Sequence, residues 1–172
     1  MRVRSTLILT TAAAALVAGA AVPALADSGT SAETVIVSAG GLAMTAPAAK
    51  TLGTVAPGSL SVGDTLGTTK VTDTRGGVAG FGVTAGSGEF ASGGDTIAAT
   101  RVDYDSGAVD ATTGSTAVTK GPQTDLSSPR SVVSASATDG YNTATWDPTL
   151  KVNLPTNVKA GSYVGTITTS VS

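Results

Sequence analysis

The sequence predicts an all-β protein, an antiparallel β-sandwich of Ig-like or barrel-like form, and three observations support this. Glycine, threonine, serine, alanine and valine dominate the 172-residue chain, whereas glutamate occurs only at Glu33 and Glu89. Apolar and polar residues alternate over several short runs, which is the period of a half-buried strand. Glycine, aspartate and proline interrupt these runs, as turn residues do. Because 41% of the residues are hydrophobic, the pattern favours a folded domain over a disordered chain.

The first 26 residues have the organisation of a secretory signal peptide. Arg2 and Arg4 form a positive n-region, an apolar stretch covers residues 7–21, and Ala24-Leu25-Ala26 is a small-x-small cleavage site. The apolar stretch is shorter than the roughly 20 residues that a membrane-spanning helix needs. We therefore expect cleavage before Asp27, no membrane span, and a secreted protein that is extracellular or associated with the cell wall.

Removal of this peptide leaves 146 of the 172 residues, which is enough for a single domain with its own core. We expect an N-terminal segment at residues 27–45, which can hold a first strand, and a β-sandwich domain at residues 46–172. The exported chain carries eight basic and twelve acidic residues, so its net charge is −4. With no basic patch, this charge argues against a nucleic-acid partner. The chain has no cysteine, so the core must stabilise it without disulfides.

The alternating runs give the positions of the strands. The first two are expected at residues 34–37 and 51–55. The others are expected at residues 70–73, 81–84, 96–102, 117–119, 131–136, 141–146 and 150–154. Alternating runs around Val152 and Tyr163, joined by a short segment rich in Pro, Gly and Asn, predict a final antiparallel pair. About eight to ten short strands with frequent turns are typical of a sandwich or a barrel.

The chain contains neither histidine nor cysteine. This removes Ser-His-Asp and Cys-His catalysis, since both use imidazole as the base. It also removes the usual zinc sites, which depend on the same two residue types. A pair of carboxylates can hydrolyse a glycoside, but nothing in the sequence marks such a pair. We therefore expect a protein that is not an enzyme and that uses no cofactor.

Three carboxylates, Asp103, Asp105 and Asp110, surround a turn at Gly107. Calcium prefers such clusters of oxygen ligands, and the extracellular space supplies the ion, so these residues are the candidate metal ligands. The segment lacks the twelve-residue EF-hand pattern and its closing glutamate. A solvated hairpin turn explains the same residues, because aspartate and glycine are turn formers. The sequence leaves both interpretations open, and a structural turn is the simpler one.

Six aromatic side chains remain after the signal peptide. They form either a stacking platform for sugars or the core of a sandwich that has few other large side chains. We expect Trp146 to lie in the core, since tryptophan is usually mostly buried. We expect Tyr163, which follows Gly161, to fix the position of the last strand. The six are Phe81, Phe90, Tyr104, Tyr141, Trp146 and Tyr163.

Several segments resemble the WxL domain, a surface module of Gram-positive bacteria. The family's Asp-x-Arg-Gly motif is similar to Asp73-Thr74-Arg75-Gly76, and its Gly-Trp-x-Leu motif is similar to Gly80-Phe81-Gly82-Val83. The closing Ala-Gly-x-Tyr segment of the family is similar to Ala160-Gly161-Ser162-Tyr163. The similarity extends over about residues 50–172, as a module of one domain requires. The resemblance implies an all-β fold and non-covalent attachment to the cell wall through peptidoglycan.

The chain departs from the family at both copies of the Trp-x-Leu motif. Phe81 and Val83 stand at the first copy, and Thr169-Ser170-Val171 stands at the second, while Trp146 lies upstream of it. The chain therefore resembles a divergent member, in which the fold is better supported than wall binding. The candidate binding or structural residues are Asp73, Arg75, Phe81, Trp146 and Tyr163.

The function expected from these observations is that of a secreted bacterial cell-surface protein. It would bind cell wall glycan or peptidoglycan non-covalently through the WxL-like domain. The alternative is a structural subunit that associates with other surface proteins by strand addition at a sheet edge, without wall binding of its own. For Asp73, Arg75 and Phe81 a structural role is expected, with the first two stabilising the turn into Gly76.

Overall fold

A computed structural model describes residues 32–112, 116–119, 121–136 and 140–172. Nearly all of the regular secondary structure among the described residues is strand, and antiparallel sheets pack against one another, which confirms the predicted all-β class. The predicted signal peptide lies outside the described residues. The chain divides after Ile36 into two units, and the larger one, residues 37–172, contains all the strands described.

The described part of the first unit, residues 32–36, is exposed and contains neither helix nor strand. The prediction of a strand at residues 34–37 is therefore wrong. These residues have the composition of a strand, but a strand also requires a hydrogen-bonding partner, and none is paired with them in the sheets.

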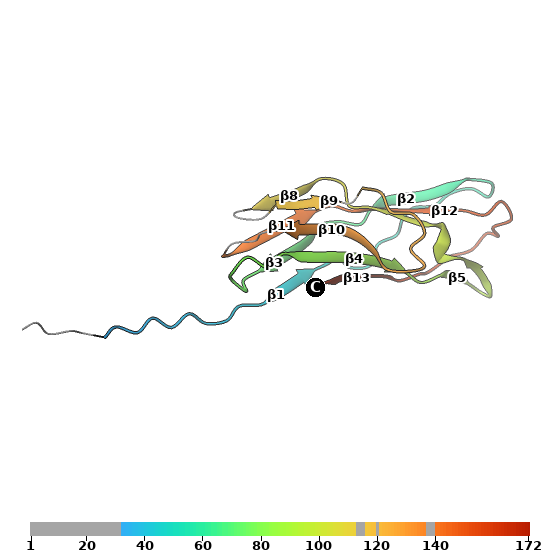
Figure 1. The fold of residues 1–172 in the computed structure, drawn as a ribbon. Helices are drawn as coiled ribbons and strands as arrows, with labels where there is room; N and C mark the ends of the chain where they lie inside the picture. Colours follow the sequence, from blue (N-terminus) through green and yellow to red (C-terminus); the bar gives the residue numbers. More distant parts are fainter. Residues whose placement is uncertain (1–31, 113–115, 120, 137–139) are drawn as a thin grey trace, which may run out of the picture. The chain divides into compact units, whose positions relative to one another are not determined.

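The strands of the larger unit form four antiparallel sheets (Figure 1). The first sheet has the order β1 (Leu42–Thr45), β3 (Thr69–Asp73), β11 (Asn142–Trp146) and β8 (Val109–Thr112). The second has the order β13 (Ile167–Val171), β4 (Phe81–Ser87), β10 (Arg130–Ser136) and β9 (Thr116–Thr119). The third has the order β2 (Ser61–Thr65), β12 (Thr149–Asn153) and β7 (Val102–Asp105), and β5 (Phe90–Ser92) pairs with β6 (Asp95–Ile97). A 3-10 turn, η1 (Ala99–Arg101), leads into β7.

The third sheet continues the first lengthwise. Each of its strands is joined to a strand of the first sheet by two or three residues, β2 to β3, β7 to β8 and β11 to β12. Between β11 and β12 the chain passes through the buried Pro148, which has no N–H to donate to a ladder. The carbonyl oxygen of Pro148 instead accepts from the N–H of Leu66 at 2.7 Å, between β2 and β3. Two sheets thus form one long layer with a break.

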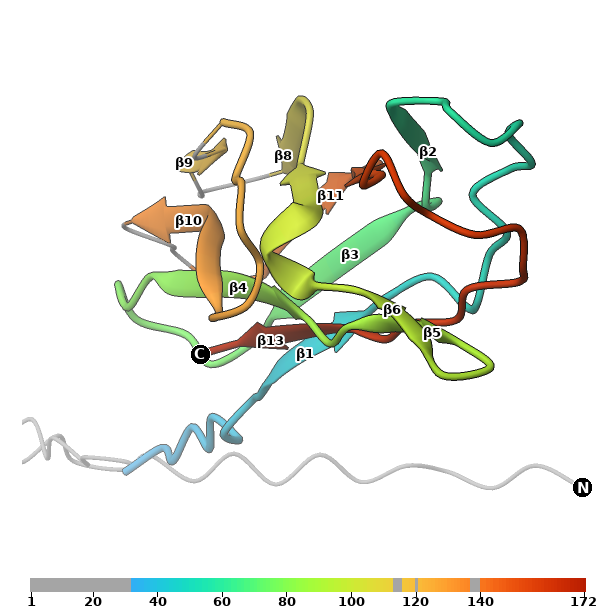
Figure 2. The same cartoon turned by 90° about the vertical axis from the view of Figure 1, so that its right-hand side faces the viewer.

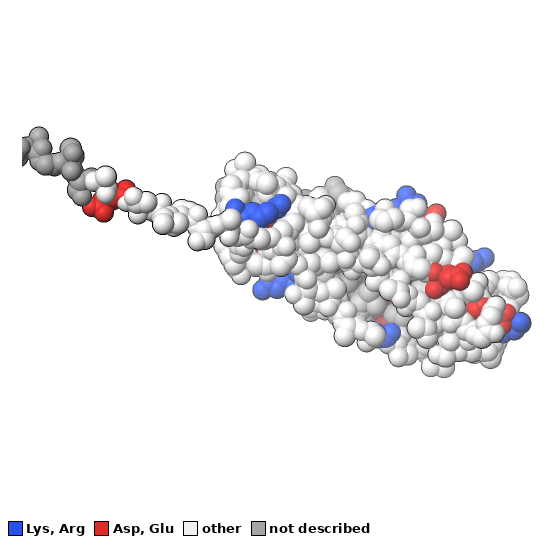
Figure 3. Space-filling model, turned by 90° about the horizontal axis from the view of Figure 1, so that it is seen from below, with Lys and Arg blue, Asp and Glu red and all other residues white. Residues whose placement is uncertain are grey.

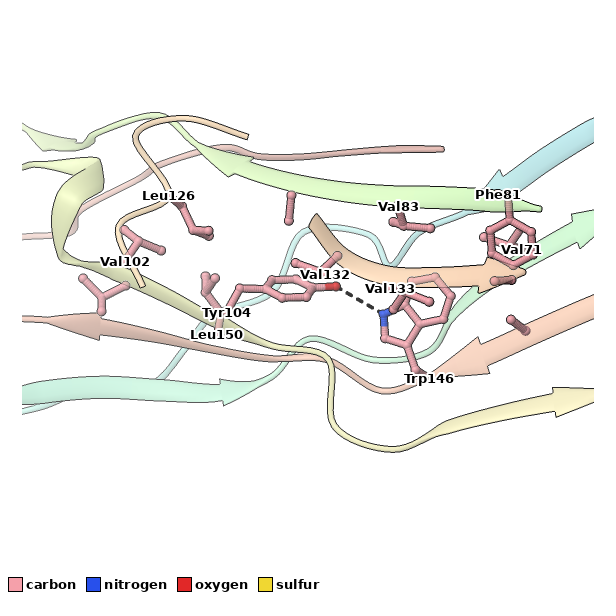
Figure 4. Close-up of a cluster of buried hydrophobic side chains, with 14 of the residues drawn as sticks. Val71, Phe81, Val83, Val102, Tyr104, Leu126, Val132, Val133, Trp146 and Leu150 are labelled. Atoms are coloured by element: carbon pink, nitrogen blue, oxygen red, sulfur yellow. Dashed lines mark hydrogen bonds between the residues drawn. The ribbon is translucent and has the colours of Figure 1, made fainter. Parts of the chain in front are cut away.

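The first and second sheets face each other, as the view along the strands in Figure 2 shows. Figure 4 shows the side chains between the layers, with Val71 of β3 opposite Phe81 and Val83 of β4. The buried cluster then extends along the third sheet through Tyr104 and Leu150. Small and β-branched residues fill most of the interior, so the few aromatic rings supply much of its apolar area.

The structure also corrects other details of the strand prediction. Residues 51–55 form no strand, and Gly53 among them has a φ of +119°, outside the β region. Residues 96–102 do not form one strand, because η1 separates β6 from β7. The final antiparallel pair is wrong: β13 pairs with β4, whereas β12 pairs with β2 and β7. Strand β1 pairs with β3, so the sandwich begins before residue 46.

Candidate functional site

The predicted pair Asp73 and Arg75 forms a brace at the end of β3. The Arg75 guanidinium donates from Nε to Asp73 Oδ1 at 3.0 Å and from Nη2 to Asp73 Oδ2 at 2.9 Å. The same Nη2 donates to the carbonyl oxygen of Gly80, just before β4, at 2.9 Å. The hydrogen bond with Asp73 raises the pKa of Arg75. The bond from Arg75 to Gly80 links the end of β3 to the start of β4. Because Asp73 is buried, the pair presents no carboxylate to a ligand.

Glycine is required at the end of this brace. A Cβ at Gly80 would lie 2.1 Å from the carbonyl oxygen of Ala135 on β10, a distance that no side chain can tolerate. The Gly-Phe-Gly-Val segment that resembles the WxL motif therefore begins at a close approach between two main chains. The next residue, Phe81, is buried in the core.

Trp146 is also a core residue and lies against Tyr104 (Figure 4). Its indole Nε1–H donates to the Tyr104 hydroxyl oxygen at 3.3 Å. Burial raises the pKa of Tyr104, and the hydrogen bond from Trp146 partly opposes this change. Neither Phe81 nor Trp146 reaches the surface of the folded domain, so neither can stack directly on a sugar there.

Two of the three candidate calcium ligands have structural partners. Asp103 Oδ2 accepts from the Asn153 amide Nδ2 at 2.7 Å, which links β7 to β12. Asp105 Oδ1 accepts from the N–H of Gly107 at 2.9 Å and closes the turn after β7. The side chain of Asp110 lies outside the described part of the structure. Within that part, no group of three or more acidic, histidine or cysteine side chains is placed to hold a metal ion.

A groove of about 840 Å³ lies in the half of the domain that the third sheet occupies. Two long loops form its walls, residues 46–57 (the first wall) and residues 158–166 (the second wall). Figure 2 shows both loops on the same side of the domain. Most of the half-buried apolar side chains around the core line this groove; they are Leu52, Val62, Leu66, Leu154, Val158, Tyr163 and Ile167. The core is therefore less completely covered here than between the first and second sheets.

The main chain of both walls has unused hydrogen-bonding capacity. Among the described residues, no main-chain hydrogen bond involves residues 48–55 of the first wall or residues 160–163 of the second. The second wall is fixed to β5 at one point, where Val164 and Ala91 exchange N–H···O bonds of 3.0 and 2.9 Å. An apolar groove between two extended segments with free N–H and C=O groups can accept an added strand.

The lysines that line the groove are both ion-paired. Lys50 Nζ lies 2.9 Å from Asp64 Oδ2 and also donates to the carbonyl oxygen of Thr65. Lys159 Nζ lies 2.8 Å from Asp95 Oδ1, and this hydrogen bond raises the pKa of Lys159. Figure 3 shows one face of the molecule as mostly uncharged, with basic and acidic residues in small separate groups. The groove therefore favours an apolar ligand over an anionic polymer.

Tyr163 is the one sequence-predicted candidate that lines the groove. Its hydroxyl donates to the carbonyl oxygen of Lys159 at 3.2 Å and so braces the second wall. A Cβ at Gly165 would lie 2.6 Å from the ring of Phe90, so the absence of a side chain lets this ring pack directly against the second wall. The groove thus owes its shape to Tyr163, which belongs to the segment resembling the WxL closing motif, and to Gly165 just after it.

Sequence reasoning missed the groove itself. Residues 46–57 are rich in alanine and proline and suggest no chemistry, and the strand expected at residues 51–55 does not form. The clue in the sequence was the apolar content of this segment beside its prolines, which indicates a segment that packs against the core without pairing as a strand. The two walls are about a hundred residues apart in the chain, so only the fold brings them together.

Comparison of the chain with protein-family models, curated proteins and solved structures finds no match. Within the described residues, no helix has the length and apolar character required to cross a membrane.

Proposed function

We propose that this chain is an exported, non-catalytic module of the bacterial cell surface that associates with other surface proteins by taking an extended peptide segment into its groove. The observation that carries the proposal is the groove itself, in which half-buried apolar side chains lie between two walls with unpaired main-chain groups. Main-chain bonds to a wall would supply affinity, and the apolar pockets would select alternate side chains of the partner.

A second candidate is direct, non-covalent binding of cell wall peptidoglycan, as the resemblance to WxL domains implies. The observation in its favour is that the segment similar to the family's closing motif, with Tyr163 and Gly161, forms a wall of the groove. Against it, the two aromatic residues nearest in kind to the family's tryptophans, Phe81 and Trp146, are buried. The lysines at the groove are already paired with carboxylates.

A binding experiment with two kinds of cell envelope separates these candidates. Native envelopes retain their proteins, whereas sacculi stripped with detergent and protease retain only peptidoglycan and its attached polymers. The test variant is Val55→Asp/Val164→Asp, which places a charge on each wall at residues that are 41% and 72% exposed. The control is Val78→Asp, at a residue that is 73% exposed and does not line the groove.

The proposal expects native envelopes to retain the wild type and Val78→Asp equally. Retention of Val55→Asp/Val164→Asp should fall by about tenfold or more, because a charge in an apolar contact is costly. Stripped sacculi should retain none of the three. Equal retention of the wild type by stripped sacculi would instead support wall binding, and full retention of the groove variant by native envelopes would exclude the groove from either function.

A further inference from the structure

The segment Thr34-Val35-Ile36-Val37 presents an unusual surface. Val35, Ile36 and Val37 are 86%, 85% and 88% exposed, although three consecutive β-branched apolar residues are typical of a buried or paired strand. Exposed apolar residues that occur singly need no explanation, but a contiguous run with the propensity of a strand marks a contact surface. We call residues 34–37 the arm.

We propose that the arm of one copy of this protein occupies the groove of a second copy as an added β-strand. This inference rests on the proposed function, since it requires that the groove accept an extended segment, and it names the partner as another molecule of the same chain. Every exported copy carries both halves of such a contact, an unpaired strand-forming segment and a groove that lacks a strand.

The chemistry of the arm fits the groove. Side chains alternate across a strand, so Val35 and Val37 share one face and Thr34 and Ile36 share the other. The face with two valines would enter the groove among half-buried residues such as Leu52 and Val158. The arm carries no charge, and the groove offers no unpaired lysine to attract one. Its main-chain groups can pair with the free groups of residues 48–55.

The connection to β1 favours a second copy over the molecule's own groove. Thr74 holds Gly41 by three hydrogen bonds, two to the Gly41 carbonyl oxygen and one from its N–H. A Cβ at Gly40 would lie only 1.7 Å from the carbonyl oxygen of Thr74, so the two main chains are in close contact at this point. Only Ser38 and Ala39 remain between the seated glycines and Val37, and two residues span about 7 Å.

The first wall begins at Ala46, beyond the far end of the four-residue strand β1, which is about 13 Å long. The link of two residues is therefore shorter than the length of β1 that separates it along the chain from this wall. A contact between copies has no such limit. Because the arm and the groove are different surfaces, the contact is head-to-tail, and it builds either rings or open chains of molecules.

The experiment measures the mass of the exported chain, purified from culture, as a function of concentration by sedimentation. The arm variant is Val35→Asp/Val37→Asp, and the groove variant is Val55→Asp/Val164→Asp. Val78→Asp is the control, and circular dichroism checks that each variant is folded. The wild type and the control should self-associate, whereas the arm variant and the groove variant should each associate at least tenfold more weakly. Ile36→Asp should weaken association less than the arm variant, because its side chain faces away.

A mixture of the two defective variants provides the sharpest result. The arm variant retains an intact groove and the groove variant retains an intact arm, so the mixture should form heterodimers although neither forms larger species alone. A wild type that stays monomeric at every concentration, or an arm variant that assembles like the wild type, overturns the inference. Retention of the arm variant by native envelopes, together with loss of the groove variant, would leave the proposed function standing with a different partner.

Discussion

The indole N–H of Trp146 donates to the hydroxyl oxygen of Tyr104 at 3.3 Å, and both residues are only 2% exposed. The two belong to different sheets, since Trp146 ends β11 of the first sheet and Tyr104 lies on β7 of the third. The bond therefore spans the break in the long layer, where the ladder of main-chain hydrogen bonds is interrupted. It satisfies a buried donor that would otherwise lie in an apolar core.

Replacement of Tyr104 by phenylalanine should destabilise the domain by about 1–2 kcal/mol, because the ring remains but the buried indole N–H loses its acceptor. The length of the bond places the expected cost toward the lower part of this range. Urea unfolding followed by circular dichroism measures the change. Tyr141→Phe is the matched control, since Tyr141 is exposed and its replacement should leave the unfolding midpoint unchanged. An equal midpoint for both variants would show that the bond contributes nothing.

The same tyrosine should make the stability depend on pH in alkaline solution. Burial raises the pKa of Tyr104 above the value near 10 that it has in an unfolded chain. The unfolded state therefore releases the phenolic proton first, and the free energy of unfolding should fall as the pH rises above about 10. Below that pH both states hold the proton, so this group should cause no change between pH 7 and 9.

Urea midpoints measured at a series of alkaline pH values test this expectation. The decrease above pH 10 should be smaller in Tyr104→Phe than in the wild type. Ultraviolet absorbance gives a second readout, because the difference between the wild type and Tyr104→Phe isolates the phenol of Tyr104, whose pKa burial raises. A Tyr104 phenol that ionises near pH 10 while the fold persists would contradict the assigned burial.

Much of the fold was accessible from the sequence, since local alternation is read directly from neighbouring residues. The pattern found β3, β4, β9, β10, β11 and β12 because each of these strands alternates over its own length. It placed the first strand at residues 34–37 and not at β1, because the contact of Gly40 and Gly41 with Thr74, just before β1 begins, leaves no local signal. It also paired the last two runs with each other, because proximity in the sequence suggested a hairpin.

The candidate site could be predicted only in part, for a related reason. The brace of Asp73 and Arg75 was foreseen, because its partners are two residues apart and local geometry brings them together. Tyr104 and Trp146 are 42 residues apart, and nothing in the sequence pairs them. The groove depends on two loops about a hundred residues apart in the chain, so its existence follows from the tertiary arrangement alone.

The brace leads to a prediction about stability without loss of binding. Asp73→Ala should cost about 1.5–3 kcal/mol, since it removes a buried carboxylate that accepts charge-assisted hydrogen bonds. Arg75→Ala should cost less stability than Asp73→Ala, because the guanidinium is partly exposed. The stability of Arg75→Lys should lie between those of Arg75→Ala and the wild type, since an ammonium cannot reproduce the two-bond contact. The unfolding midpoint in urea measures each effect.

Arg130→Ala is the control for this series, because its ion pair with Asp125 is 3.7 Å long and exposed, and such pairs contribute little. Each folded variant of the brace should bind native envelopes like the wild type, since neither residue lines the groove. Loss of envelope binding by a fully folded Arg75→Ala would assign this arginine to the binding surface instead.

Gly165 offers a test of the wall that closes over Phe90. A Cβ at this position would lie 2.6 Å from the phenyl ring, so Gly165→Ala should destabilise the domain by about 1–3 kcal/mol through overpacking. Gly82→Ala is the control, because a Cβ at Gly82 on β4 meets nothing within 4 Å and its φ is not positive. Gly165→Ala should cost less stability in a Phe90→Leu background than in the wild type. The smaller leucine side chain leaves room for the added methyl group. Equal effects of Gly165→Ala with phenylalanine or leucine at position 90 would mean that the ring does not set the position of the wall.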